Sequence, residues 1–185
     1  MSAQRISHIL KLAFLLIVFL CIWPVARAAD LSGDSKVVSD LLSEAKTEAI
    51  QLRNDSTDME SFTLSNLSWE SHAAKIMEIK DHVNAAAKTV DKLNLAKDRA
   101  SSWQKTAIER VNPLMAELAM NTEATINHLN REKGHLLNNQ EHKDYLKTNA
   151  DLATRMAALV SDFVEYGEIK AKFETLSKHL EISER

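Results

Sequence analysis

The sequence predicts an all-α protein, an elongated antiparallel four-helix bundle that follows an N-terminal signal peptide. Three observations predict this class. Apolar residues recur every three or four positions in four separate segments. The apolar arc of the third segment is too wide for one neighbouring helix to cover. The connections are short, so successive helices should run in opposite directions. We expect helices over residues 35–53, 68–93, 101–133 and 139–182.

Residues 1–28 have the form of a signal peptide. Arg5 and Lys11 supply the positive start, residues 12–23 form an unbroken apolar run, and Ala26 and Ala28 are the small residues that a signal peptidase reads. We expect cleavage after Ala28, leaving residues 29–185 as one helical-bundle domain. An uncleaved membrane anchor is the alternative. The run of 12 residues is, however, short against the ~20 that span a bilayer.

Loss of the signal would change the composition of the chain. Removing 28 residues and their three basic side chains from the 185 leaves 157 residues with 20 basic and 26 acidic side chains, a formal net charge of −6. This acidic balance and the absence of a basic stripe disfavour nucleic-acid binding. The one cysteine, Cys21, lies in the signal, so stability must come from packing. We expect a bacterial periplasmic or secreted protein with no stable membrane span after signal removal.

The segment 101–134 is the predicted centre of the bundle. Ser101 followed by Gln104 has the form of a capping box, which marks a helix start. Gly134 is a candidate for the helix end. The residues of the apolar arc are Trp103, Ala107, Ile108, Val111, Leu114, Met115, Leu118, Thr122, Thr125, Ile126 and Leu129.

The first two helices are predicted on either side of a polar connection. Residues 54–67 are rich in Asn, Asp, Ser and Thr, whose short side chains compete for backbone hydrogen bonds and favour turns. We expect this segment to be a protease-sensitive connection that places Met59, Phe62 and Leu64 against the bundle. Ser68 should cap the second helix.

The fourth helix is the longest, and Asn138 is its predicted cap. About 40 residues give a helix of roughly 60 Å. Its apolar positions are Tyr145, Leu152, Met156, Leu159, Phe163, Tyr166, Ile169, Phe173, Leu176 and Leu180. The shorter first helix should leave the end of this stripe uncovered, unless the second and third helices cover it. We expect Phe173 and Leu176 to be the most exposed large apolar residues and to mediate self-association or partner docking.

Six histidines in the mature chain raise the question of a metal site. A di-iron bundle needs Glu-x-x-His pairs on two helices, and the one such pair, Glu132 with His135, lies across a predicted helix end. His82 and Glu78 are expected to form a solvent-exposed pair. His72 lies beside an apolar stripe, where a buried imidazole needs a hydrogen-bond partner.

Haem is the more plausible cofactor of a periplasmic bundle. The Cys-x-x-Cys-His attachment motif is absent, so ligation would have to come from a histidine and a methionine. His72 or His128 could act with Met77, Met115 or Met156, although methionine more often fills core space.

Several short patterns together resemble a group of uncharacterised exported helical proteins of soil bacteria, the acidobacteria especially. They are Trp69-x-x-His72-Ala73, Trp103-Gln104 followed by Ala107-Ile108 and Pro113, the segment 122–130 ending in Leu129-Asn130, and Asp162-Phe163-Val164-x-Tyr166-Gly167. The resemblance implies an exported all-helical protein and brings no activity, cofactor or site residues.

No nucleophile elbow, phosphate-binding glycine loop or cysteine nucleophile occurs in the mature sequence. We therefore predict a protein that is not an enzyme, with no catalytic, cofactor-binding or metal residues. The expected function is that of a non-catalytic binding, assembly or structural factor in the cell envelope. The alternative is a periplasmic haem- or metal-binding four-helix bundle.

Overall fold

The computed structural model describes residues 33–65, 67–132 and 139–181. The predicted signal segment, Gly134 and Asn138 lie outside these ranges. These described residues belong to one compact unit. Its regular elements are α2 (Lys36–Ser61), the 3₁₀ turn η1 (Phe62–Leu64), α3 (Trp69–Ala96), the 3₁₀ turn η2 (Lys97–Arg99), α4 (Ser102–Arg131) and α5 (Gln140–His179).

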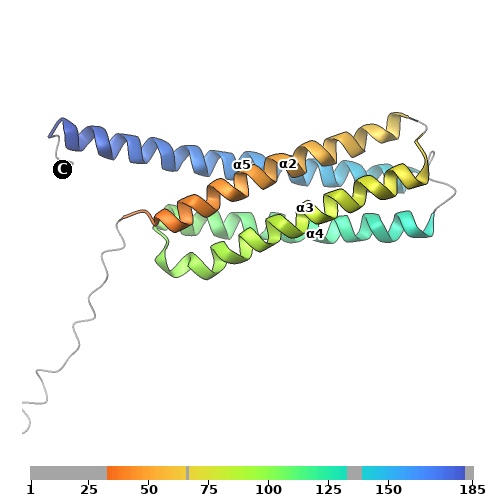
Figure 1. Ribbon diagram of the computed structural model, residues 1–185, viewed down its shortest axis with the longest axis horizontal. Helices are drawn as coiled ribbons and strands as arrows, with labels where there is room; N and C mark the ends of the chain where they lie inside the picture. Colours follow the sequence, from red (N-terminus) through yellow and green to blue (C-terminus); the bar gives the residue numbers. More distant parts are fainter. Residues whose placement is uncertain (1–32, 66, 133–138, 182–185) are drawn as a thin grey trace, which may run out of the picture. The chain divides into compact units, whose positions relative to one another are not determined.

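The four long helices form an antiparallel bundle (Figure 1). Helix α2 packs against α3 and α5, and α4 packs against the same two helices. Neighbours in the sequence are therefore neighbours in space, as short connections require. The prediction of an all-α four-helix bundle is confirmed.

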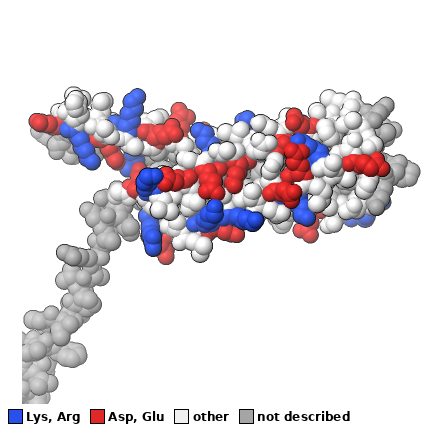
Figure 2. Space-filling view, viewed as in Figure 1, with Lys and Arg blue, Asp and Glu red and all other residues white. Residues whose placement is uncertain are grey.

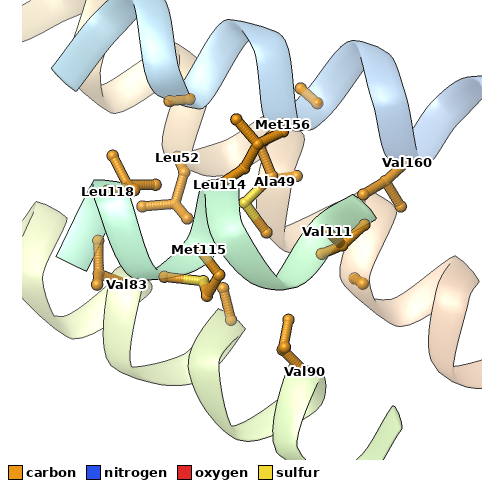
Figure 3. Close-up of a cluster of buried hydrophobic side chains, with 14 of the residues drawn as sticks. Ala49, Leu52, Val83, Val90, Val111, Leu114, Met115, Leu118, Met156 and Val160 are labelled. Atoms are coloured by element: carbon orange, nitrogen blue, oxygen red, sulfur yellow. The ribbon is translucent and has the colours of Figure 1, made fainter. Parts of the chain in front are cut away.

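The core is centred on α4, as its wide apolar arc predicts. Nine of the eleven arc residues are buried, and Trp103 and Ile126 are half-buried. Figure 3 shows Val111, Leu114, Met115 and Leu118 of α4 among side chains of the other three helices. Those labelled are Ala49 and Leu52 from α2, Val83 and Val90 from α3, and Met156 and Val160 from α5.

The predicted helix starts are correct where the signal is local. Ser68 caps α3 by accepting from the backbone N–H of Ser71. Gln104 Oε1 accepts a hydrogen bond of 3.0 Å from the backbone N–H of Ser101, as the capping box of α4 requires. The cap of α5, however, is Asn139, which accepts from His142, so the prediction of Asn138 is wrong by one residue.

Helix α2 continues through the segment predicted to be a connection, so the expected protease-sensitive loop at 54–67 is wrong for residues 54–61. Asp55 and Met59 are buried there, and tertiary contacts hold side chains that favour turns in isolation. Met59 and the half-buried Phe62 pack against the core as expected. Leu64 does not, because its side chain is 89% exposed.

Helix α5 is the longest element, with 40 residues against 26 to 30 in the other long helices. At 1.5 Å per residue it is about 60 Å long. Its C-terminal part continues past the start of α2 and projects from the bundle (Figure 1). Among the described residues, no helix combines the length and the hydropathy that crossing a membrane requires.

Candidate functional site

The projecting end of α5, residues 165–181, carries a line of exposed apolar side chains that we call the outer stripe. Each of its members is 51–60% exposed: Tyr166, Ile169, Phe173, Leu176 and Leu180. Their spacing alternates between three and four residues, which is the spacing of the a and d positions of a coiled coil. The outer stripe therefore has the form of a seam for another helix.

Beyond Tyr166, whose ring contacts Trp103 of α4, the outer stripe lies on a different face of α5 from the one that packs against the bundle. Val160 and Val164 are buried in the core. Ile169 and Phe173 each follow one of these valines by nine residues, and nine steps of about 100° place them on the opposite side of the helix. The outer stripe is consequently a second apolar face of α5. The sequence pattern instead predicts a single stripe, whose end the bundle leaves uncovered.

The prediction that Phe173 and Leu176 are the most exposed large apolar residues is wrong. They are 54% and 53% exposed, and six described residues are more exposed: Leu64 at 89%, Leu95 at 87%, Met120, Ile169, Val37 and Leu180. Leu64 and Leu95 belong to η1 and α3, away from the outer stripe. What distinguishes Phe173 and Leu176 is their regular spacing on one helix face, which Leu64 and Leu95 do not share.

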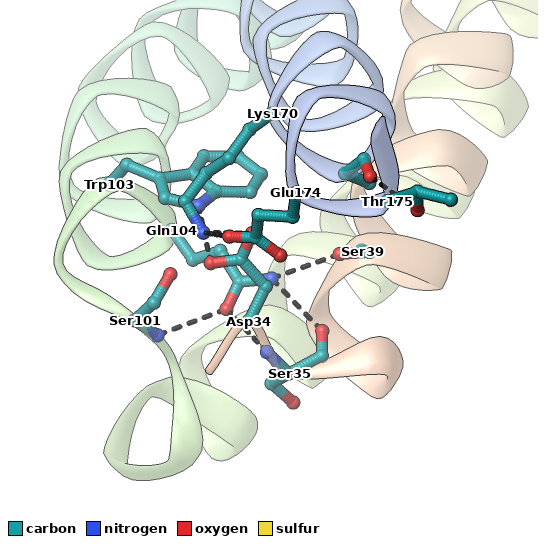
Figure 4. A network of polar contacts seen from close by, with 10 residues as sticks. Asp34, Ser35, Ser39, Ser101, Trp103, Gln104, Lys170, Glu174 and Thr175 are labelled. Carbon is teal, nitrogen blue, oxygen red and sulfur yellow. Dashed lines mark hydrogen bonds and ion pairs between the residues drawn. The ribbon is translucent and has the colours of Figure 1, made fainter. Parts of the chain in front are cut away.

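The base of the projecting end is fixed by polar contacts (Figure 4). The Trp103 Nε1 donates to Asp34 Oδ1 at 2.6 Å, and the Lys170 Nζ donates to Asp34 Oδ2 at 3.0 Å. Burial alone would raise the pKa of Asp34, but hydrogen bonds from Lys170 and Trp103 outweigh it and hold this pKa below its usual value. Asp34 therefore stays ionised and links the start of α2 to α4 and α5.

Gln104 completes this base as a fully satisfied buried side chain. Its Oε1 accepts from the backbone N–H groups of Ser35 and Ser101, both at 3.0 Å. Its Nε2 donates to the Ser35 carbonyl at 2.9 Å and to the Ser39 hydroxyl at 3.0 Å. One amide thus caps α4 and holds the start of α2 beside it.

The second candidate region is the histidine cluster, formed by His72, His128 and His142 at the opposite end of the bundle. All three side chains are buried. His72 Nδ1 and His142 Nε2 are 3.1 Å apart and share one hydrogen bond. The rings of His128 and His142 are stacked with centroids 5.8 Å apart. Helices α3, α4 and α5 supply one residue each.

The histidine cluster leaves four buried ring nitrogens without a hydrogen-bond partner in the structure: Nε2 of His72, both nitrogens of His128 and Nδ1 of His142. Burial lowers the pKa of His72. Burial, together with the neighbouring His72 and His128, lowers the pKa of His142 to about 4. His72 and His142 are therefore neutral at pH 7, and neutral rings avoid the cost of a buried charge.

The histidines and methionines considered for haem or metal binding do not come together at one site. His72 and His128 do meet in the histidine cluster, but Met77 is exposed while Met115 and Met156 lie in the apolar core. Within the described ranges, no three His, Cys, Asp or Glu side chains are arranged to hold a metal ion. Of the Glu132 and His135 pair, His135 lies outside those ranges.

The expected pair of His82 with Glu78 is wrong. The His82 Nδ1 lies 2.6 Å from Asp55 Oδ2, and Lys75 contacts both Asp55 and Glu78. Burial would raise the pKa of Asp55, yet hydrogen bonds from Lys75, Gln51 and His82 lower it overall. This arrangement explains how α2 buries an acidic residue, and it requires no ligand.

Sequence reasoning missed the histidine cluster because its members are far apart in the chain. A positional signal was available. In an antiparallel bundle, residues equally distant from the turns lie at the same level. His72 follows the cap Ser68 by four residues, His142 follows the cap Asn139 by three, and His128 precedes the last residue of α4 by three.

Comparisons with protein-family models, with curated proteins and with solved structures gave no significant match to this chain.

Proposed function

We propose that this is an exported, non-catalytic helical-bundle protein that acts as a binding or assembly factor in the cell envelope. The projecting end of α5 is its docking surface for one partner helix. The observation that carries the proposal is the outer stripe, five exposed apolar residues in a, d spacing, of which Tyr166, at its base, also packs against the Trp103 ring. Export rests on the signal pattern of residues 1–28, and the resemblance to exported helical proteins supports it.

A partner helix fits this surface better than a small ligand does. Large exposed apolar stripes mark interaction sites, and an amphipathic helix recognises another through anchors spaced by three and four residues. The contacts of Asp34 with Trp103 and Lys170 hold the base of the projecting end in place. Less conformational freedom is then lost on binding.

The charges beside the outer stripe indicate the chemistry of the partner. Glu165, Lys172 and His179 occupy the positions next to the seam on one edge, and Lys170, which is paired with Asp34 and Glu174, lies on the other. In an antiparallel pair of identical copies that sets Tyr166 opposite Leu176, Lys172 would face its own copy, which is repulsive. We therefore expect a different chain, an amphipathic helix with Asp or Glu beside its apolar stripe.

Mixed charge covers the rest of the visible surface. In Figure 2, Lys and Arg side chains alternate with Asp and Glu on the face in view.

The test uses two defined peptides and two matched double variants. Both peptides are helical with Leu at a and d; one has Glu and the other Lys at the flanking positions. The protein should bind the Glu peptide at least about tenfold more tightly, because only it complements Lys172. Phe173→Ser with Leu176→Ser should abolish binding and leave thermal stability nearly unchanged, since both side chains are over half exposed.

The control is Leu64→Ser with Leu95→Ser, which removes two apolar side chains of greater exposure outside the outer stripe. It should bind the Glu peptide as the unmodified protein does. Equal loss of binding in both double variants would contradict the proposal. So would a loss of ~2 to 5 kcal/mol in stability for the Phe173 and Leu176 variant, which would place these residues in a core. N-terminal sequencing of the protein from the envelope should begin at residue 29.

A periplasmic haem- or metal-binding protein is the second candidate function, and the meeting of His72 and His128 in one buried cluster favours it. Visible absorption and elemental analysis of protein purified from its own envelope separate the two functions. Near-stoichiometric haem or metal would support the second.

A further inference from the structure

The histidine cluster joins three helices through groups that can each take up a proton. His72, His128 and His142 come from the start of α3, the end of α4 and the start of α5, which meet at one end of the bundle (Figure 1). The centroids of His72 and His142 are 5.1 Å apart and those of His128 and His142 are 5.8 Å apart. Protons on two of these rings would set like charges against each other in a buried site.

We propose that the histidine cluster is a proton-operated latch, which holds α3, α4 and α5 together while its rings are neutral and releases this end of the bundle in mildly acidic surroundings.

The groups that face the cluster compensate little positive charge. On α5, Glu141 lies 3.7 Å from His128 Nδ1 but its side chain is 61% exposed, so water weakens that interaction. Tyr145, also on α5, contacts the His128 ring. From η1 the neighbour is Phe62, an uncharged ring against His72.

The carboxylate that α2 buries is not available to the cluster, because Asp55 is bonded to Lys75 and His82. His82 is bonded to this same carboxylate and is not a member of the cluster. The described groups thus favour neutral rings and provide no buried counter-charge for protonated ones.

The direction of the pH effect follows from linkage. The pKa values of His72 and His142 are lowered by folding, so the opened chain, with ordinary histidine pKa values near 6.5, binds more protons than the closed one. The closed state is fully favoured above pH ~6.5 and loses its advantage as the pH falls toward about 4, the folded pKa of His142. Each such histidine raises the opening equilibrium constant by up to about tenfold per pH unit.

A proton explains these observations better than a metal ion. The three rings stack or pair with each other, and the described part of the chain contains no group of ligands arranged around a common point. Metal binding would require the rings to turn, and the addition of zinc described below tests for it.

Two tryptophans report on the two ends of the bundle. The Trp69 Nε1 donates to the Leu129 carbonyl at 3.0 Å, beside His128, whereas Trp103 lies at the opposite end against Asp34. In protein labelled with 5-fluorotryptophan, ¹⁹F NMR gives each tryptophan its own signal. Between pH 7.5 and 4.5 the Trp69 signal should move to its solvent-exposed position before the Trp103 signal changes.

The decisive variant is His142→Gln, which retains a hydrogen-bonding side chain but cannot be protonated in this range. It should lower the opening equilibrium constant at pH 5 by about tenfold or more. The control His179→Gln removes an exposed histidine near the end of α5 and should change nothing. If His142→Gln does not fold, His72→Gln gives the same comparison.

Three outcomes would overturn the latch. The Trp69 and Trp103 signals could move together, showing only global unfolding. His142→Gln could leave the Trp69 transition where it was. ZnCl₂ at pH 7.5 could shift the Trp69 signal stoichiometrically, with the shift lost in His142→Gln, and this would identify a metal site. A separated Trp69 transition that responds to His142→Gln and not to zinc supports the latch.

Discussion

Gln104 and His128, at opposite ends of the bundle, bury polar groups in opposite ways. At the end where α4 begins, Gln104 is 0% exposed and its amide makes four hydrogen bonds. At the other end, neither ring nitrogen of the equally buried His128 has a hydrogen-bond partner in the structure. A satisfied buried amide stabilises the fold and specifies its packing. A buried polar group that has no hydrogen-bond partner lowers the stability of the fold by about 1–3 kcal/mol.

This difference indicates where the bundle is built for stability and where it retains groups that stability does not require. Leucine in place of His128 would fill similar space without the desolvation cost. The histidine end is therefore the place to look for a property other than stability, whereas the Gln104 end supports the projecting helix.

Substitution by leucine should change the free energy of unfolding very differently at the two ends. Gln104→Leu should lower the free energy of unfolding by about 4 kcal/mol at pH 7, because it leaves the backbone groups of Ser35 and Ser101 without partners. His128→Leu should change it by less than about 1 kcal/mol, or raise it, since no hydrogen bond is lost. Chemical denaturation of both variants measures the difference, and equal losses would remove the contrast between the two ends.

A buried charge with all its partners provides a second comparison. Asp55→Asn should cost about 2 kcal/mol at pH 7, because hydrogen bonds to charged groups contribute about 1.5–3 kcal/mol each. The folded pKa of Asp55 is lowered, so its stabilisation is present above the unfolded pKa of about 3.9 and is lost as the pH falls through the folded value.

Urea denaturation between pH 3 and 7 checks this prediction. The gap between Asp55→Asn and the unmodified protein should stay constant down to pH ~4 and then narrow. Narrowing already at pH 6 would assign to Asp55 the acid sensitivity that we attribute to the histidine cluster.

The smallest effect concerns how closely α5 approaches α4 at the base of the projecting end. A Cβ on Gly167 would lie 2.8 Å from the Trp103 ring. Gly167→Ala should therefore cost about 1 kcal/mol, as overpacking is partly offset by the better helix propensity of alanine. Trp103→Phe in the same chain should reduce this penalty. Gly33→Ala, with nothing within 4 Å, is the control; an equal loss there would exclude a steric cause.

The sequence predicted features that depend on nearby residues. Ser68 as a cap, the capping box of Ser101 with Gln104, and the wide apolar arc of α4 all follow from spacings of a few positions. The four-helix class follows from the same periodicity. The partly buried state of Trp103 is also as the apolar arc of α4 predicts.

The features that were missed depend on partners far away in the chain. The helical state of residues 54–61 is supported by Asp55, whose partners Lys75 and His82 are 20 and 27 residues away. The sequence pattern of α5 merged two faces into one stripe, because only the neighbouring helices determine which face is covered. The histidine cluster required the relative levels of three helices, which composition and periodicity do not provide.

The contact between Asp34 and Lys170 spans 136 positions of the chain and has a mechanical consequence. A helix that continues past its bundle acts as a rigid lever, and force applied to Phe173 or Leu176 is carried to the point where the lever is clamped. That clamp is Asp34, held by Lys170 and Trp103, immediately before α2 begins. Traction from a docked partner would accordingly load the start of α2 before it loads the core.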